Sequence, residues 1–273
     1  MKKFYTSIEF YKLKSHNQKL KIMTSIFDAH VHLSDDEYKG EIDFILYSME
    51  RLDIKACSVS MDNNSSQITL ELSKKSKTVL PFIGIHPEKA NDDLESMIQL
   101  IHQNSRNIAG IGEIGLDKTY VADEEVFTRQ KQVFTRLLRE AEKMKKPVSV
   151  HSRRTLDEIL TIIPSYDIRG FLLHWFNGNK SQLRKAIDLG CFVSYGPASV
   201  YSHDKQTLIS ITDKDRILVE TDGPVKFSHC FGMKPAQPSF IPSVIFCVAK
   251  IFGISYDECA SILETNSKNY LQI

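Results

Sequence analysis

The alternation of short apolar segments with amphipathic segments, repeated eight times along the 273 residues, is the strongest constraint on the fold of this chain. Segments such as VLPFIGIHP and IAGIGEIGLD lack the polar alternation of half-exposed strands, as expected for parallel strands that are covered on both faces. The segments between them, such as KGEIDFILYSMERL, carry apolar residues three and four positions apart, which predicts helices. Eight strand–helix units in about 250 residues predict an α/β fold, a TIM-type (β/α)8 barrel that is either regular or distorted.

The main alternative for such a pattern is a doubly wound open sheet. That fold calls for a glycine-rich fingerprint after the first strand, where this chain instead has His30 and His32. No linker, low-complexity tract or internal repeat divides the chain, so we predict one catalytic domain over residues 25–273. Residues 1–24 are predicted to form an N-terminal extension, a basic arm or short helix on the outside that has no catalytic role.

The composition excludes several classes of protein. With 42% hydrophobic and 25% charged residues, the chain has the composition of a soluble globular enzyme, and its net charge of +1 provides no overall attraction to polyanions. Its five cysteines are scattered and form no CxxC pair, which indicates free thiols in a reducing cytosol. No apolar run reaches the roughly 18 residues of a membrane helix, and the lysine-rich N-terminus lacks the apolar segment of a secretory signal. We therefore expect a cytoplasmic protein with no membrane partner.

Histidines and acidic residues gather where the predicted strands end, which is where TIM barrels place their catalytic residues. In SIFDAHVHL, the residues Asp28, His30 and His32 alternate with apolar ones, so their side chains point to the same face of the strand. Later strands end in His86, Glu113, Asp117, His151, His174, Glu220 and Asp222. A single histidine at such a place is usually structural, but neutral imidazoles and carboxylates crowded into one barrel mouth are costly unless a cation joins them.

The residues at these strand ends predict a divalent metal centre. Its candidate ligands are His30, His32, Glu113, His151, His174 and Asp222. Mixed nitrogen and oxygen ligands suit Zn, Mn or Fe and, less typically, Mg. Six ligands are too many for one tetrahedral ion and suit a pair of ions about 3.5–4 Å apart with a carboxylate between them. We expect Glu113, which lies midway around the barrel, to bridge the pair.

Strand order assigns the remaining ligands to the two ions. His30, His32 and Asp222 are expected to hold one ion, because the first and eighth strands are neighbours in a closed barrel. His151 and His174, on adjacent strands, are expected to hold the other ion. Asp28 lies on the same face as His30 but one layer deeper, and we expect it to hold His30 in place rather than to bind an ion.

The ordered motifs FDAHVHL, GIHP, GEIGLD, PVSVHSR, HWFNG and ILVETDGP resemble those of the TatD-like metal-dependent nucleases in the amidohydrolase superfamily. The resemblance runs from about residue 26 to the C-terminus. It implies a TIM-like barrel, a phosphodiesterase centre with one to three divalent metal ions, and exonuclease-type cleavage of DNA. It also places the family's ligand roles on the same six residues.

The resemblance further implies that His86 lies near the substrate phosphate, where a protonated imidazole would stabilise the charge on the phosphate oxygens. In the expected mechanism, a pair of divalent ions (Mg, Mn or Zn) activates a water molecule, and Asp222 orients this water or accepts its proton. The predicted catalytic residues are therefore Asp222, Glu113 and His86.

The chain departs from the usual family pattern at four positions: Glu88 replaces a frequent histidine, Arg154 an acidic residue, Trp175 a small residue or cysteine, and Gly223 a serine. Arg153, Arg154 and Trp175 flank the predicted ligands. Together with His86 they are the predicted substrate contacts, the arginines on backbone phosphates and the indole on a base. Lys118 and Lys226 also follow ligand strands. For each of these cations the alternative is an ordinary solvated charge, and for the indole it is a packed aromatic.

The segments HSRR and HWFNG are similar to TatD-like nucleases encoded in bacterial anti-phage operons of the Qat type. This similarity implies antiviral defence, with DNA as the nucleic-acid partner and protein partners in an operon-encoded complex. Three other functions remain open: amide, lactone or ester hydrolysis of the amidohydrolase type, deacylation of aminoacyl-tRNA, and a barrel that serves only as a binding subunit. Glu113 argues against the amidohydrolases that bridge their metals with a modified lysine, and the complete ligand set argues against an inactive barrel.

Overall fold

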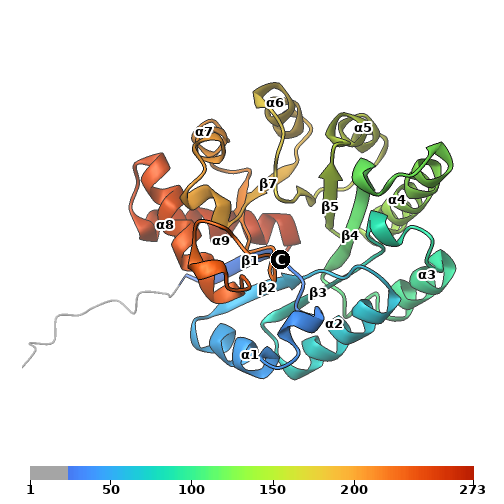
Figure 1. Ribbon diagram of the computed structural model, residues 1–273, viewed down its shortest axis with the longest axis horizontal. Helices are drawn as coiled ribbons and strands as arrows, with labels where there is room; N and C mark the ends of the chain where they lie inside the picture. Colours follow the sequence, from blue (N-terminus) through green and yellow to red (C-terminus); the bar gives the residue numbers. More distant parts are fainter. Residues whose placement is uncertain (1–23) are drawn as a thin grey trace, which may run out of the picture.

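The computed structural model describes residues 24–273, in which eight strands and nine α-helices alternate around a barrel (Figure 1). The strands are β1 (Ile26–Val31), β2 (Ile54–Ser58), β3 (Val79–Ile83), β4 (Gly110–Asp117), β5 (Val148–Arg153), β6 (Phe171–Leu173), β7 (Phe192–Tyr195) and β8 (Ile217–Val219). They follow one another in sequence order, and each paired neighbour is parallel. This arrangement confirms the predicted TIM-type barrel. The predicted N-terminal extension lies, apart from Thr24, outside the described residues.

The helices form the outer layer of the barrel. They are α1 (Ile42–Arg51), α2 (Asn63–Lys75), α3 (Leu94–Gln103), α4 (Glu124–Met144), α5 (Leu156–Ile162), α6 (Lys180–Asp188), α7 (His203–Ser210), α8 (Ile241–Phe252) and α9 (Tyr256–Leu271). The longest, α4, begins where the Asp123 carboxylate accepts the backbone N–H of Val126 at 3.0 Å. It ends at Lys145, whose φ of 54° is left-handed, two residues before Pro147. Its buried apolar side chains recur at helical spacing and face the barrel.

The barrel is closed between β8 and β1 by the residues that follow β8. No strand ladder joins β8 to β1 in the described part of the chain. Instead the Asp222 N–H donates to the carbonyl of His30 at 2.9 Å, and the His32 N–H donates to the carbonyl of Gly223 at 2.8 Å. Below these bonds, the buried Asp28 carboxylate accepts the backbone N–H and the hydroxyl of Thr221. The barrel is therefore the distorted version of the predicted fold, with its seam next to the predicted metal ligands.

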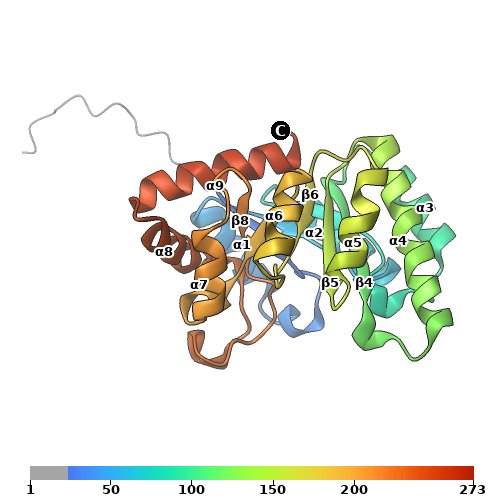
Figure 2. The ribbon, with the colours of Figure 1, turned by 90° about the horizontal axis from the view of Figure 1, so that it is seen from above.

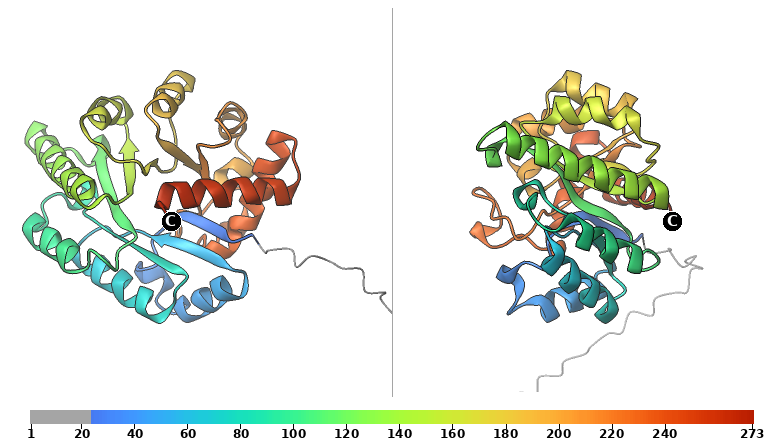
Figure 3. Two further views of the ribbon diagram at one scale, coloured as in Figure 1. Left: turned by 180° about the vertical axis from the view of Figure 1, so that it is seen from behind. Right: turned by 90° about the vertical axis from the view of Figure 1, so that its right-hand side faces the viewer.

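The final helix, α9, covers the N-terminal end of the barrel, as Figures 2 and 3 show. Its Tyr270 ring stacks on Phe82 at 6.0 Å between centroids, and its hydroxyl donates to the carbonyl of Val148 at 3.2 Å. The Asn266 amide donates to the carbonyls of Lys214 and Ile217, at the start of β8. Because this end is sealed by packed side chains, the C-terminal ends of the strands form the open end.

No individual helix in the described part of the chain combines the length and the apolar composition that crossing a membrane requires. Only the bent pair Pro238–Phe252 and Tyr256–Leu271, which meet at 107°, passes a test of length and composition together. Both helices contribute buried side chains to the protein core. All five cysteines are free thiols, as predicted. The expected burial holds for Cys57, Cys191 and Cys259, whereas Cys230 and Cys247 are partly exposed.

Asp28→Ala is expected to lower the free energy of unfolding by about 2–4 kcal/mol, because it leaves the buried N–H and hydroxyl of Thr221 without an acceptor. The corresponding fall in melting temperature is on the order of 5–15 °C, measured by circular dichroism. Asp43→Ala, at an exposed position in the first turn of α1, is the control and is expected to melt like the wild type. Equal melting temperatures for the two variants would contradict the role of this seam.

Candidate metal centre

Side chains from five segments converge at the open end of the barrel. They are His30 on β1 and His32 just after it, Glu113 on β4, His151 on β5, His174 just after β6, and Asp222 after β8. The period of two in an extended strand brings His30 and His32 together, with their Nε2 atoms 3.3 Å apart. The structure thus gathers all six residues that the sequence selects as ligands.

The buried carboxylate of Glu113 lies between two pairs of histidines. Its Oε2 atom lies 3.4 Å from Nε2 of His30 and 3.3 Å from Nε2 of His32. Its Oε1 atom lies 2.8 Å from Nε2 of His174 and 2.9 Å from Nδ1 of His151. Each oxygen therefore faces a separate set of nitrogens, which is the arrangement of a carboxylate that bridges two ions.

The first set of donors comprises His30, His32, Glu113 and Asp222, and five of its six donor separations lie in a narrow range. Asp222 Oδ1 lies 3.5 Å from Nε2 of His30 and 3.6 Å from Nε2 of His32. With the contacts of Glu113 and the 3.3 Å between the two imidazoles, the known separations all fall between 3.3 and 3.6 Å. Ligands at about 2.0–2.2 Å from a common tetrahedral ion are about 3.3–3.6 Å apart. His30, His32 and Glu113 therefore fit a divalent ion in both chemistry and spacing, and Asp222 adds a carboxylate oxygen beside the two histidines.

The second set of donors, from His151, His174 and Glu113, has three protein ligands instead of four. His174 Nε2 and His151 Nδ1 are 3.4 Å apart, and both face Oε1 of Glu113. Three protein ligands leave room for water or substrate, as in catalytic metal sites. The other nitrogen of His151, Nε2, lies 2.7 Å from the buried carboxylate of Asp117. Asp117 thereby accepts the Nε2–H of the ring and leaves Nδ1 free to bind an ion.

The supporting contacts of His30 come from β5 and from its own strand. The ring Nδ1 lies 2.8 Å from the hydroxyl of Ser149, while Asp28 accepts the backbone N–H of His30 at 3.2 Å. Asp28 thus holds the backbone, as expected of a supporting residue, and Ser149 holds the ring. The sequence carries a signal for Ser149, because it precedes His151 by two positions and so shares its face of β5.

The charges of the cluster set the protonation of its histidines. Burial lowers the pKa of His32, but hydrogen bonds to Asp222 and Glu113 outweigh it and raise the pKa to about 10. Burial likewise opposes protonation of His151, yet hydrogen bonds to Asp117 and Glu113 raise its pKa to about 9. Burial together with the charge of His174 lowers the pKa of His30 to about 4. Contact with these carboxylates therefore favours the protonated forms of His32 and His151.

His86 lies beside the cluster as a neutral hydrogen-bond donor. Its Nε2 atom is 3.7 Å from Oε1 of Glu113, and its Nδ1 accepts the backbone N–H of Glu88 at 3.2 Å. Burial lowers the pKa of His86 to about 3, although the charge of Glu113 opposes this shift. Burial thus favours the neutral imidazole, whereas the sequence-based expectation is a protonated ring beside a substrate phosphate. The proton of the neutral ring lies on Nε2, which points toward the metal ligands.

A cleft of about 730 Å³ opens beside the second set of donors, lined by His151, His174, Asp222, Arg153, Arg154 and Trp175 among others. Both arginines are exposed, and neither has an acidic partner within 4 Å among the described residues. In contrast, Lys118 pairs with Glu158 and Lys226 pairs with Glu37, as in the alternative that treats them as ordinary surface charges. The two arginines are thus the cations available to an anion in this cleft.

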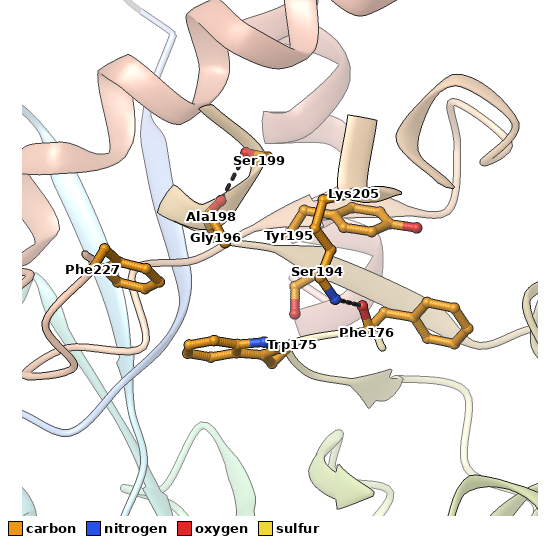
Figure 4. A pocket seen from close by; sticks show the side chains of 9 residues that line it. All are labelled: Trp175, Phe176, Ser194, Tyr195, Gly196, Ala198, Ser199, Lys205 and Phe227. Atoms are coloured by element: carbon orange, nitrogen blue, oxygen red, sulfur yellow. Dashed lines mark hydrogen bonds between the residues drawn. The ribbon is translucent and has the colours of Figure 1, made fainter. Parts of the chain in front are cut away.

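The rim of the cleft is strained. Three non-glycine residues of the site have left-handed φ angles, Arg154 at 57°, Trp175 at 42° and Asp222 at 49°. Such conformations are uncommon for large side chains and concentrate at functional sites. The indole of Trp175 is partly exposed and stacks on Phe227 at 5.5 Å between centroids and 18° between planes (Figure 4). One face of the indole is therefore packed, as the alternative for this residue predicts.

Binding of a divalent ion is expected to release protons, because a ligating imidazole nitrogen must be unprotonated. Since the pKa values of His32 and His151 are raised to about 10 and 9, their protons are present at pH 6–8 and affinity for Mn²⁺ should rise with pH across this range. Calorimetric titration in two buffers of different ionisation enthalpy measures the protons released. Affinity independent of pH, with no proton release, would contradict this account.

Comparison with known proteins identifies the family of the chain and agrees with its fold. The family model described as TatD related DNase matches residues 27–272. An uncharacterized metal-dependent hydrolase of Bacillus subtilis, YabD, is 26% identical over 255 residues, covering 91% of this chain and 99% of its own. Human deoxyribonuclease TATDN3 is 26% identical over 262 residues, covering 91% of this chain and 94% of its own.

Solved structures show the same barrel. The crystal structure of YJJV, a TatD homologue of Escherichia coli, superposes with a TM-score of 0.83 at 22% identity, covering 91% of this chain and 98% of its own. A TatD family hydrolase from Entamoeba histolytica superposes with a TM-score of 0.80 at 21% identity, covering 90% and 98%. Together with the family model, which spans nearly all of the described residues, these findings show that the chain belongs to the TatD-related DNase family of metal-dependent hydrolases.

Proposed function

We propose that this protein is a deoxyribonuclease that hydrolyses phosphodiester bonds at DNA ends with a pair of divalent ions. The observation that carries the proposal is the carboxylate of Glu113, whose two oxygens face two separate sets of ligand nitrogens. In this proposal His30, His32 and Asp222 hold one ion, His151 and His174 hold the other, and Glu113 bridges them. The relative named as a deoxyribonuclease supports DNA as the substrate.

The ions, which are Mg, Mn or Zn in this proposal, supply a water of lowered pKa and neutralise charge on the phosphate. The oxygen of this water attacks phosphorus, the ester bond opposite to it breaks, and the departing ester oxygen takes a proton from solvent to leave as a hydroxyl. Asp222 Oδ1 faces the histidines, so Oδ2 is the oxygen that accepts the proton of the water. The pKa of Asp222 supports this role: burial raises it, but the hydrogen bond to His32 and nearby histidine charges outweigh burial and lower it.

Other residues in and beside the cleft bind and orient the substrate. The Nε2–H of His86 donates to a phosphate oxygen, which stabilises the charge that builds up there. The unpaired guanidinium groups of Arg153 and Arg154 bind phosphates on the flanking nucleotides. Trp175, supported by Phe227 behind it, offers the free face of its indole to a base near the strand end.

We also propose a biological role and a cellular location for this activity. The segments HSRR and HWFNG, with Arg154 and Trp175 at their variable positions, support a cytoplasmic anti-phage nuclease that works with operon-encoded protein partners. Plaque counts on cells that carry the whole operon test this setting. Protection that is lost with Glu113→Gln supports it, and protection that persists with this variant contradicts it.

Glu113→Gln and His151→Ala are each expected to lower DNA cleavage by at least about 1,000-fold, because each removes a ligand on which water activation depends. The assay uses end-labelled single- and double-stranded DNA and RNA with added Mg²⁺, Mn²⁺ or Zn²⁺. Matched controls are Glu71→Gln and His203→Ala, two exposed positions on α2 and α7, and both should keep wild-type activity. Cleavage that survives both ligand substitutions would disprove the site. Hydrolysis of dipeptides, lactones or aminoacyl-tRNA without cleavage of nucleic acid would disprove the proposed substrate.

Arg153→Gln and Arg154→Gln are expected to raise KM for DNA by about 10-fold each with a smaller change in kcat, since they bind phosphates away from the reacting one. Each variant should also reduce the salt dependence of binding by about one counterion. Arg169→Gln is the control, because Arg169 is exposed and precedes β6 at the opposite end of the barrel. If the three variants show the same KM and salt dependence, neither arginine binds the substrate.

A further inference from the structure

One nitrogen of the proposed second metal subsite has no hydrogen-bond partner. Among the described residues, only two buried side-chain nitrogen or oxygen atoms lack one, Nδ1 of His174 and Oγ of Ser58. The carboxylate oxygen Oε2 of Glu220 lies 4.0 Å from Nδ1 of His174, about 1 Å beyond hydrogen-bond distance. A buried polar atom without a hydrogen-bond partner lowers the stability of the folded state by about 1–3 kcal/mol. Such atoms are rare in native proteins, and each one needs a physical explanation.

Glu220 is itself fully buried and held on two sides. Its Oε1 accepts the backbone N–H of Trp175 at 2.8 Å, and its Oε2 accepts the hydroxyl of Ser194 at 2.5 Å. Trp175 and Ser194 line the small pocket of Figure 4, on the turn after β6 and on β7. Oε2 retains acceptor capacity after this bond, because a carboxylate oxygen accepts more than one hydrogen.

The turn that carries His174 and Trp175 is held from both of its ends. Glu220 holds the N–H of Trp175, whose φ is left-handed. The ammonium of Lys205, on α7, donates to the carbonyl of Phe176, as drawn in Figure 4, and to the side chain of Asn177 at 3.0 Å. The position of the His174 ring relative to Glu220 is therefore set by the hydrogen bonds that Glu220 and Lys205 make to the backbone of this turn.

A neutral imidazole carries one proton, and its position decides whether His174 is able to bind an ion. In the structure Nε2 of His174 faces Oε1 of Glu113 at 2.8 Å, while Nδ1 has no hydrogen-bond partner. When Nε2 binds an ion, the proton must lie on Nδ1, which then needs an acceptor. Oε2 of Glu220 faces this atom and reaches it by a side-chain movement of about 1 Å.

We propose that Glu220 is a positioning residue that accepts the Nδ1–H of His174 and so turns Nε2 of this ring toward the second ion. The inference rests on the proposed ligand set and adds to it a residue outside that set. It accounts for the buried unpaired nitrogen of His174, which is satisfied only in the metal-bound tautomer. It also predicts an asymmetry: loss of Glu220 weakens the ion held by His151 and His174 and spares the ion held by His30, His32 and Asp222.

Glu220→Gln tests this inference with little change of volume. The Trp175 N–H requires an oxygen opposite it, so the amide NH₂ of the new side chain faces Ser194 and His174 and donates to Nδ1. Calorimetric titration of the full chain with Zn²⁺ alone should show one ion bound as in the wild type and the other weakened by about 10–100-fold. Long-range ¹H–¹⁵N spectra of the Zn²⁺-loaded protein should show the proton of His174 on Nδ1 in the wild type and on Nε2 in the variant.

Two further variants serve as comparisons. One tests whether the position of the Glu220 oxygens matters in addition to their charge, and the other tests whether a different unpaired buried atom has the same effect. Glu220→Asp keeps the charge but withdraws the oxygens by one methylene, so it should weaken the same ion. Ser58→Ala removes the other unpaired buried atom and should leave both ions and the tautomer unchanged. Circular dichroism checks that both Glu220 variants are folded. If both then bind the two Zn²⁺ ions as tightly as the wild type and keep the His174 proton on Nδ1, the inference is overturned. A wild type that binds fewer than two Zn²⁺ ions would instead overturn the ligand set, and the inference with it.

Discussion

The site and the mouth of the barrel depend on one buried carboxylate, that of Glu113 on β4. Its two oxygens each face a separate pair of imidazole nitrogens at 2.8–3.4 Å, and the strands that carry those imidazoles are placed around it by the barrel. So many polar groups at such depth cost free energy unless a cation joins them. The barrel therefore presents a set of donors whose charge divalent ions would balance, and the same carboxylates raise the pKa values of His32 and His151.

The same region also closes the fold. Where a regular barrel would pair β8 with β1, this one uses backbone bonds from Asp222 and Gly223 to the ends of β1, with the carboxylate of Asp28 beneath them. Because Asp222 and His30 take part in the seam through their backbones and in the metal centre through their side chains, the geometry of the site is set by the closure of the barrel. A change at the seam is therefore expected to alter both the stability of the fold and the binding of metal.

The sequence allows the barrel, its strand order and the six converging residues to be predicted, because strand periodicity and the position of TIM-barrel sites follow from local rules. The contacts between strands do not follow from such rules. That Ser149 meets His30, that Asp117 meets His151 and that Glu220 faces His174 depends on strand register and on the shape of each turn. The neutral state of His86 depends on its burial, and the pairing of Lys118 and Lys226 with glutamates depends on loops whose paths the sequence pattern does not define.

The central claim is that Glu113 bridges two ions held by different histidines. Anomalous diffraction from crystals grown with Mn²⁺ or Zn²⁺ tests it most directly, because it locates each ion relative to the carboxylate. The account predicts two peaks about 3.5–4 Å apart, one beside His30, His32 and Asp222 and the other beside His151 and His174, with one oxygen of Glu113 bound to each. A single peak, or peaks that leave either oxygen of Glu113 without an ion, would contradict it.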